Sequence, residues 1–359
     1  MTALSATVGH VGDHATAIDA LRSLEDRLHA HTRDWPGDWP APAEPIQAWT
    51  ALGRPHTLLL WAESGTIARV WLTPDGQAGA DCVELSDGGR LQDAAVLIPR
   101  QLVASLTSSG CADDLVIAAP DDLRALPYPM LRLPCHDGER LNSFAAVSLL
   151  PSLSWGAYAQ ARRTAATHTG SVVAYLDPAL DLHRVAGLIR RVDTQAQEAG
   201  SLADLGRHLV GQHSPAIVLI GAHGRITPDG SIDVRDHTGR SITPEDFATW
   251  QVPSVAMLVG CRTATGNGTA PLHLVEAALV AGANHIVAAT APMTDEVADR
   301  VLARVLVLLG VLPSATAAGM APSQAVQGAL QQFDRAFPYP SEDLTDWPIV
   351  HVGLPGSAG

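Results

Sequence analysis

The second half of the chain alternates between apolar runs of strand length and segments with helical spacing. The apolar runs lie at 171–176, 216–221, 255–260 and 285–290, each bounded by turn-forming residues. Near-continuous apolar runs are typical of strands that are buried on both faces. Since helical patterns separate these runs, the sequence predicts a parallel sheet that is covered by helices on both sides.

Two of these helices are marked by their first residues. Thr243 is placed as an N-cap, with Pro244 at the first helical position and acidic residues in the first turn. Thr294 is placed in the same way, and Asp295 and Glu296 follow it, where carboxylates favour the helix N-terminus. The sequence therefore predicts helices that begin at 244 and at 295.

The first half of the chain predicts a mixture of helix and strand. Residues 14–32 have leucines at helical spacing, and the proline-rich segment 34–45 cannot continue that helix. Two β-rich runs within 56–76 predict a hairpin with its turn at 64–65. Residues 113–120 predict a buried strand. This order favours an α+β arrangement before the regular α/β part.

Two of the predicted parallel strands are followed by reactive side chains. The run at 216–221 leads to His223 and Gly224, and the run at 255–260 leads to Cys261. Consecutive strands are usually neighbours, and ligand sites lie beyond their carboxyl ends, so we expect the two side chains to face one groove. An imidazole activates a thiol as nucleophile, and the N–H of a following glycine can stabilise an oxyanion. This set predicts acyl transfer through a thioester, whereas simple packing is the alternative for a cysteine at a strand end.

The motifs resemble those of a known family. "AHG" after one strand and "GC" after the next are similar to caspase-like peptidases, and the order of segments resembles the CHAT family in particular. Four further stretches carry the resemblance, which spans about residues 90 to 356: "DDLRALPYPMLRL" at 121–133, "VSLLPSLSW" at 147–155, "LVEAALVAGANHIVAATAPMTDEVADRVL" at 274–302 and "DWPIVHVGLPG" at 346–356. The stretch "TAPMT" departs from the family, whose members often have tryptophan there.

The resemblance implies a fold and a division of the chain. The fold is α/β: a caspase-like, parallel-dominated sheet flanked by helices, an α/β/α sandwich, with an N-terminal α+β half before the catalytic half. We therefore expect an N-terminal helix and proline-rich linker over 1–50. An N-terminal pseudo-caspase-like half of the CHAT region would follow over 51–165, and a catalytic caspase-like half over 166–359.

The resemblance also implies roles for single residues. His223 would be the imidazole partner, Cys261 the nucleophile, and the backbone N–H groups of Gly224 and Cys261 the oxyanion hole, with no cofactor and no metal. Asp177, Asp295 and Arg262 are the candidates for substrate binding, and either acid would favour arginine or lysine before the cut. Two structural alternatives stay open: Asp177 as a turn residue before a proline, and Asp295 as an ordinary first-turn helix acid.

Charge and composition narrow the partners. The chain of 359 residues has a net charge of −14 and no lysine, which disfavours nucleic acid and anionic membranes as partners. The first residues lack the basic and apolar regions of a secretory signal, and the longest apolar runs are too short to span a bilayer. The four cysteines are far apart and form no CxxC pair, so we expect neither a disulfide framework nor a zinc site, and a cytoplasmic location.

The motifs and the resemblance together predict a caspase-like cysteine endopeptidase. The resemblance implies that it cleaves a specific protein partner in a regulated setting such as prokaryotic defence or programmed cell death, where relatives are often found. Many CHAT proteins are fused to helical repeats, which this sequence lacks, so a regulator or sensor would be a separate protein. The main alternative is a catalytically silent caspase-like scaffold or sensor. A nucleotide-binding enzyme is disfavoured because "GNGTAPLH" at 266–273 lacks the G-x-G-x-x-G order and no lysine exists for a P-loop.

Overall fold

The computed structural model divides into two compact units. The first comprises Met1–Asp34, Asp38–Arg162 and Leu354–Gly359, and the second comprises Trp35–Gly37 and Arg163–Gly353. The structure describes residues 14–32, 35, 41–84, 97–108, 113–124, 126–133, 139–162, 172–192, 197–210, 215–227, 232–260, 263, 273–309, 320–336 and 349–355. Within these ranges no helix is long and apolar enough to cross a membrane. The three-part division made from the sequence stays a prediction.

The strands of the first unit run in the order β3-β2-β1-β4-β5. Their bounds are β1 (His56–Glu63), β2 (Thr66–Leu72), β3 (Ala78–Glu84), β4 (Asp113–Ala118) and β5 (Ala145–Leu150). β1, β2 and β3 form an antiparallel meander, whereas β1, β4 and β5 are parallel. Ser64 and Gly65 form the predicted turn with φ values of 51° and 79°, as a two-residue hairpin of type I′ requires.

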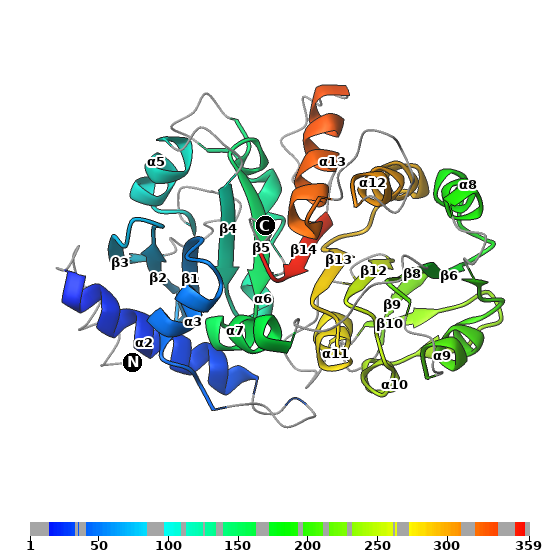
Figure 1. Cartoon of the computed structure of the whole chain (residues 1–359), viewed down its shortest axis with the longest axis horizontal. Coiled ribbons are helices and arrows are strands. Elements are labelled where there is room, and N and C mark those ends of the chain that lie inside the picture. The colour runs from blue at the N-terminus through cyan, green and yellow to red at the C-terminus, as the bar shows by residue number, and fades with distance from the viewer. Residues whose placement is uncertain are drawn as a thin grey trace. The chain divides into compact units, whose positions relative to one another are not determined.

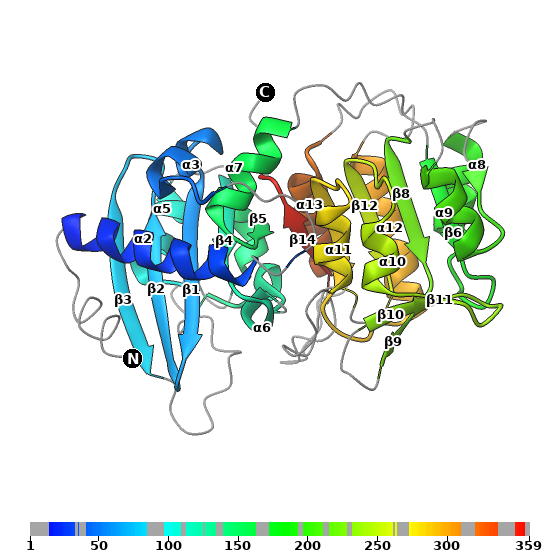
Figure 2. The same cartoon turned by 90° about the horizontal axis from the view of Figure 1, so that it is seen from below.

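Helices cover both faces of this sheet. α2 (His14–His31), α3 (Pro45–Ala51) and α7 (Leu153–Arg162) lie on one face, and α5 (Arg100–Ser108) lies on the other (Figures 1 and 2). The fully buried Glu25 of α2 accepts hydrogen bonds from the backbone N–H groups of Leu153 and Ser154, at 2.9 and 2.7 Å. It thereby caps the start of α7. α2 is therefore part of the core of the first unit.

The main sheet of the second unit runs in the order β14-β13-β12-β8-β6-β7. Its strands are β6 (Val172–Leu176), β7 (Gln197–Glu198), β8 (Ile217–Gly221), β12 (Val255–Val259), β13 (His285–Ala289) and β14 (Ile349–Gly353). All neighbours are parallel except β13 and β14. Gly221 pairs with Val259, so the ends of β8 and β12 lie level with each other.

Helices flank both faces of this sheet (Figure 1). One face carries α8 (His183–Val192), α12 (Asp295–Leu308) and α13 (Pro322–Ala336), and the other carries α9 (Leu202–Val210), α10 (Pro244–Ala248) and α11 (Leu274–Val280). The predicted caps are confirmed: the Thr243 side chain accepts from Asp246 N in a capping box, and that of Thr294 accepts from Val297 N. Between α8 and α9, the two-residue strand β7 adds to the edge of the sheet beside β6.

A second, smaller sheet follows β8. It consists of β9 (His223–Ile226), β10 (Ile232–Arg235) and β11 (Ser241–Ile242), in the order β11-β10-β9. β10 and β11 form the hairpin whose turn includes Gly239, with a φ of 85°. This sheet begins at the histidine that the sequence singled out.

Candidate active site

His223 begins a strand of its own. The sequence suggested that one strand runs directly into the histidine, whereas β8 ends at Gly221 and His223 is the first residue of β9. The backbone changes sheets at Ala222, whose N–H donates to the carbonyl of Val259 on β12 (3.1 Å). The His223 side chain is exposed and Gly224 is half-buried. The imidazole is therefore held at the carboxyl edge of the main sheet by its backbone while its ring faces solvent.

Gly260 packs directly against the residues on both sides of His223. A methyl group placed on Gly260 would lie 2.6 Å from the Ala222 carbonyl oxygen and 3.2 Å from the Gly224 nitrogen. Only glycine permits so close an approach of two backbones. Gly260 directly precedes Cys261 in the sequence. Cys261 and its neighbour Arg262, both candidates from the sequence, lie outside the described residues.

Thr263 ties the chain after this point to the sheet. Its hydroxyl donates to the carbonyl of Leu258 on β12 (2.8 Å) and accepts from the N–H of Ala289 on β13 (3.1 Å). The side chain is buried. The residues that flank 261–262 are thus anchored at the ends of two neighbouring strands. Sequence reasoning missed Thr263, since a threonine after a strand gives no distinctive signal.

A small cavity of about 30 Å³ adjoins His223. Its described lining residues are Leu180, Leu182, Ala222, His223, Val259, Gly260, Met293, Asp295 and Ala298. The structure therefore brings two of the predicted site residues, His223 and Asp295, to one cavity. Asp295 is half-buried, and one of its carboxylate oxygens accepts a hydrogen bond from the backbone N–H of Asp181 (3.0 Å).

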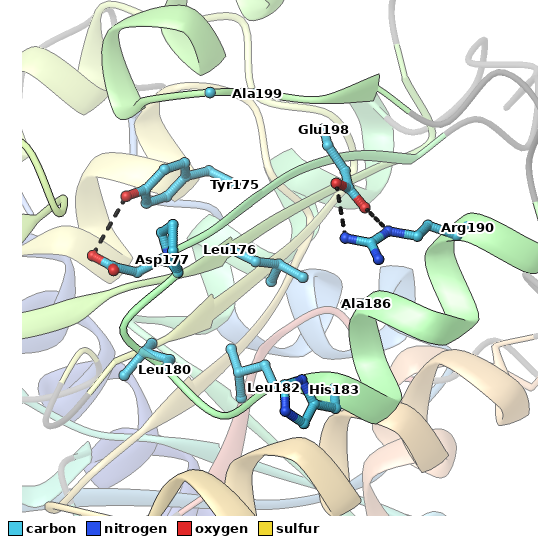
Figure 3. Close-up of a pocket in the computed structure, with 12 residues that line it drawn as sticks. Tyr175, Leu176, Asp177, Leu180, Leu182, His183, Ala186, Arg190, Glu198 and Ala199 are labelled. Atoms are coloured by element: carbon cyan, nitrogen blue, oxygen red, sulfur yellow. Dashed lines mark hydrogen bonds and ion pairs between the residues drawn. The ribbon is translucent and has the colours of Figure 1, made fainter.

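Asp177 lines a different cavity, of about 390 Å³ (Figure 3). It follows β6, is buried, and accepts through Oδ1 from the N–H of Ala179 (2.9 Å), which forms an Asx turn. Its Oδ2 lies 3.4 Å from the Tyr175 hydroxyl, and burial raises the pKa of Tyr175 to about 12. The Asp177 carboxylate thus stabilises the turn in which it lies, the alternative that was left open.

The loop between β6 and α8 is fastened by carboxylates at several points. Besides Asp177 and Asp295, Asp299 of α12 accepts from the N–H groups of Arg184 and Val185 at 3.0 and 2.8 Å. These N–H groups belong to the first turn of α8, so Asp299 serves as its cap. The residues that Asp299 bonds lie more than 100 positions away in sequence, which is why the sequence did not reveal its role.

The described part of the chain includes the thiol of Cys82, which can be compared with the proposed nucleophile. Cys82 on β3 is half-buried, and burial raises the pKa of its thiol, which disfavours the reactive thiolate. No three His, Cys, Asp or Glu side chains converge as a metal site anywhere in the described ranges. The chemistry available at the sheet edge is that of an exposed imidazole beside a close backbone approach.

No protein with a curated description matches the sequence significantly. Among solved structures, the Arg-specific cysteine proteinase gingipain R aligns with a TM-score of 0.50 and 11% identity, over 73% of this chain and 68% of that chain. A complex of the pro- and mature domains of Porphyromonas gingivalis RgpB aligns with a TM-score of 0.48 and 12% identity, over 73% and 70%.

The structure of Saccharomyces cerevisiae separase in complex with securin aligns with a TM-score of 0.48 and 12% identity, over 71% of this chain and only 17% of the separase chain. At such identities the likeness to gingipain R concerns the fold, and it confirms the predicted caspase-like α/β class. The sequence profile of the CHAT domain matches residues 47–353, a wider range than the motifs alone indicated. The chain therefore belongs to the CHAT domain family.

Proposed function

We propose that the protein is a cysteine endopeptidase in which Cys261 is the nucleophile and His223 its imidazole partner. The observation that carries this proposal is the contact of Gly260 with the backbone of Ala222 and Gly224. Cys261 follows Gly260 directly in the sequence, so the proposed nucleophile is one residue away from this close approach. The anchoring of Thr263 to β12 and β13 adds support, since it restrains the chain on the other side of Cys261.

The proposed reaction proceeds in two steps. The Cys261 thiol transfers its proton to His223, and the sulfur attacks the scissile carbonyl carbon. The backbone N–H groups of Gly224 and Cys261 stabilise the oxyanion that develops. The C–N bond then breaks, and His223 returns the proton to the leaving amine, which leaves a thioester on Cys261. Water, deprotonated by His223, hydrolyses the thioester to a carboxylate and restores the thiol.

For substrate binding, the cavity beside His223 favours Asp295 over Asp177. Asp295 lines the same cavity as the imidazole, whereas the carboxylate of Asp177 is buried and stabilises its own turn. A carboxylate there would select arginine or lysine before the cut. The description of gingipain R as Arg-specific agrees with this preference. Arg262 remains a further candidate for contacts with the substrate backbone.

We further propose a single protein substrate and a separate regulatory or sensor protein, in a cytoplasmic setting of prokaryotic defence or programmed cell death. Separase, which shares the fold, was solved in complex with a protein, securin. The alternative, a silent scaffold or sensor, would bind a partner without cutting it.

The proposal is tested with a diverse peptide library whose cleavage products are read by mass spectrometry. We expect cuts after basic residues, which disappear in Cys261→Ala and His223→Ala and persist in Cys82→Ala. Cleavage that survives Cys261→Ala would place the nucleophile elsewhere. Absence of cleavage in the unaltered protein, together with stable binding of a natural partner, would favour the scaffold.

A further inference from the structure

The small cavity beside His223 and the larger cavity on the other side of the loop 177–182 share a wall. Leu180 and Leu182 are the only described residues that line both cavities. Figure 3 shows the two leucines on one side of the larger cavity, with Glu198 and Ala199 of the β7 region on the other side. A leucine side chain that turns from the smaller cavity into the larger one would enlarge the first at the expense of the second.

The two cavities differ strongly in size. The cavity beside His223 measures about 30 Å³, which is enough for one or two water molecules and too small for an arginine or lysine side chain. The larger cavity measures about 390 Å³, within the range of ligand pockets. If a substrate side chain is to enter beside His223, the wall has to retreat, and the space for that retreat is already present behind it.

The backbone of the loop that carries the wall is held on both sides of Leu180. Asp177 holds the N–H of Ala179, and Asp295 holds the N–H of Asp181. Leu180 is half-buried, whereas Leu182 is buried and lies over Gly221. A methyl group on Gly221 would come within 2.7 Å of the Leu182 Cδ1 atom. Leucine side chains occupy discrete rotamers, so a change of rotamer moves the wall without moving the loop backbone.

We propose that Leu180 and Leu182 determine which side chain the cavity beside His223 admits, by turning into the larger cavity to open it. This inference rests on the proposed peptidase function. It assigns Asp295 a positioning role as well, because its bond to Asp181 N holds the loop segment between the two leucines. If the larger cavity is filled, the two leucines cannot turn into it, and the cavity beside His223 then admits only small substrate side chains.

Two substitutions act on the wall from opposite sides. Leu180→Ala removes part of the wall and enlarges the cavity beside His223. Ala186→Phe on α8 fills the larger cavity, which Ala186 lines, without touching the smaller one. Arg191→Phe adds the same ring to an exposed position of the same helix and is the matched control. Ala186→Leu is a milder filling variant should the phenylalanine prevent folding.

The assay compares two acyloxymethyl ketone peptides that differ only in glycine or arginine before the reactive group, and measures the rate of Cys261 labelling with each. We expect Leu180→Ala to raise the arginine-to-glycine rate ratio and Ala186→Phe to lower it, each by about tenfold, the scale of side-chain discrimination by pocket size. In Ala186→Phe the glycine rate should stay near that of the unaltered protein, and Arg191→Phe should change neither rate.

The failure of this inference is distinguishable from failure of the proposed function. If Cys261 is labelled but Leu180→Ala and Ala186→Phe both keep the arginine-to-glycine rate ratio of the unaltered protein, the leucines do not set the selectivity and the inference is overturned. If neither peptide labels Cys261 in the unaltered protein, the peptidase proposal is overturned and this inference falls with it.

Discussion

Gly260→Ala is the substitution that probes the contact between the Cys261 and His223 segments most selectively. The added methyl group would lie 2.6 Å from the Ala222 carbonyl oxygen, a backbone atom next to a strand end that cannot swing away as a flexible side chain does. To reach the 3.4 Å at which ordinary contact begins, the two segments must separate by about 0.8 Å. Such a shift is of the order that costs a catalytic site about a hundredfold in rate.

The expected result is a loss of about tenfold to a hundredfold in the rate of Cys261 labelling by a peptide acyloxymethyl ketone. We expect the free energy of unfolding to fall by about 1–3 kcal/mol, the usual cost of overpacking, so the protein stays folded. Gly187→Ala is the control, because the nearest atom to its new methyl group is a guanidinium nitrogen of Arg191 at 3.7 Å. Unchanged labelling in Gly260→Ala would refute the argument that this close approach positions the nucleophile.

Three further predictions concern stability. Burial lowers the pKa of His351 to about 3, so below pH 6.5 the unfolded chain takes up a proton that the folded protein does not. Urea unfolding should therefore show about 2 kcal/mol less stability at pH 5 than at pH 7.5, and the His351→Asn variant should lose less stability over the same range. Equal losses in both proteins would contradict this cause. Glu25→Ala should cost about 1–2 kcal/mol because two N–H groups of α7 lose their cap, and Glu25→Gln should cost less. Gly79→Ala should lower the melting temperature, since its methyl group would clash with the indole of the buried Trp71; an unchanged value would show that the ring moves freely.

Much of the fold was predictable because its signals are local. The apolar runs became β6, β8, β12 and β13, and the threonine caps and the turn at 64–65 depend on residues only a few positions apart. β3 escaped prediction because glycine and aspartate interrupt its alternation, and its stability comes from pairing with β2. β7 has only two residues, too few for any periodicity.

The site was predictable only in outline. The strand pattern placed His223 at the sheet edge, but the change to a second sheet at Ala222 depends on the bond to Val259, which no local pattern encodes. The anchoring of the loop 177–182 by Asp295 joins residues that are 114 positions apart. For the same reason the sequence left two interpretations of Asp295 open, and only the packing of α12 against the loop shows that its carboxylate binds the N–H of Asp181. The carboxylate of Asp177 binds within its own turn, at the N–H of Ala179.

The most direct test of the account is the mass of the intact protein after reaction with an acyloxymethyl ketone peptide that has arginine before the reactive group. We predict one added label on the unaltered protein and on Cys82→Ala, because burial raises the pKa of the Cys82 thiol and disfavours its reactive thiolate. We predict no label on Cys261→Ala or His223→Ala. A label that persists on Cys261→Ala would contradict the assignment of the nucleophile, and equal labelling of His223→Ala would contradict the proposed role of the imidazole.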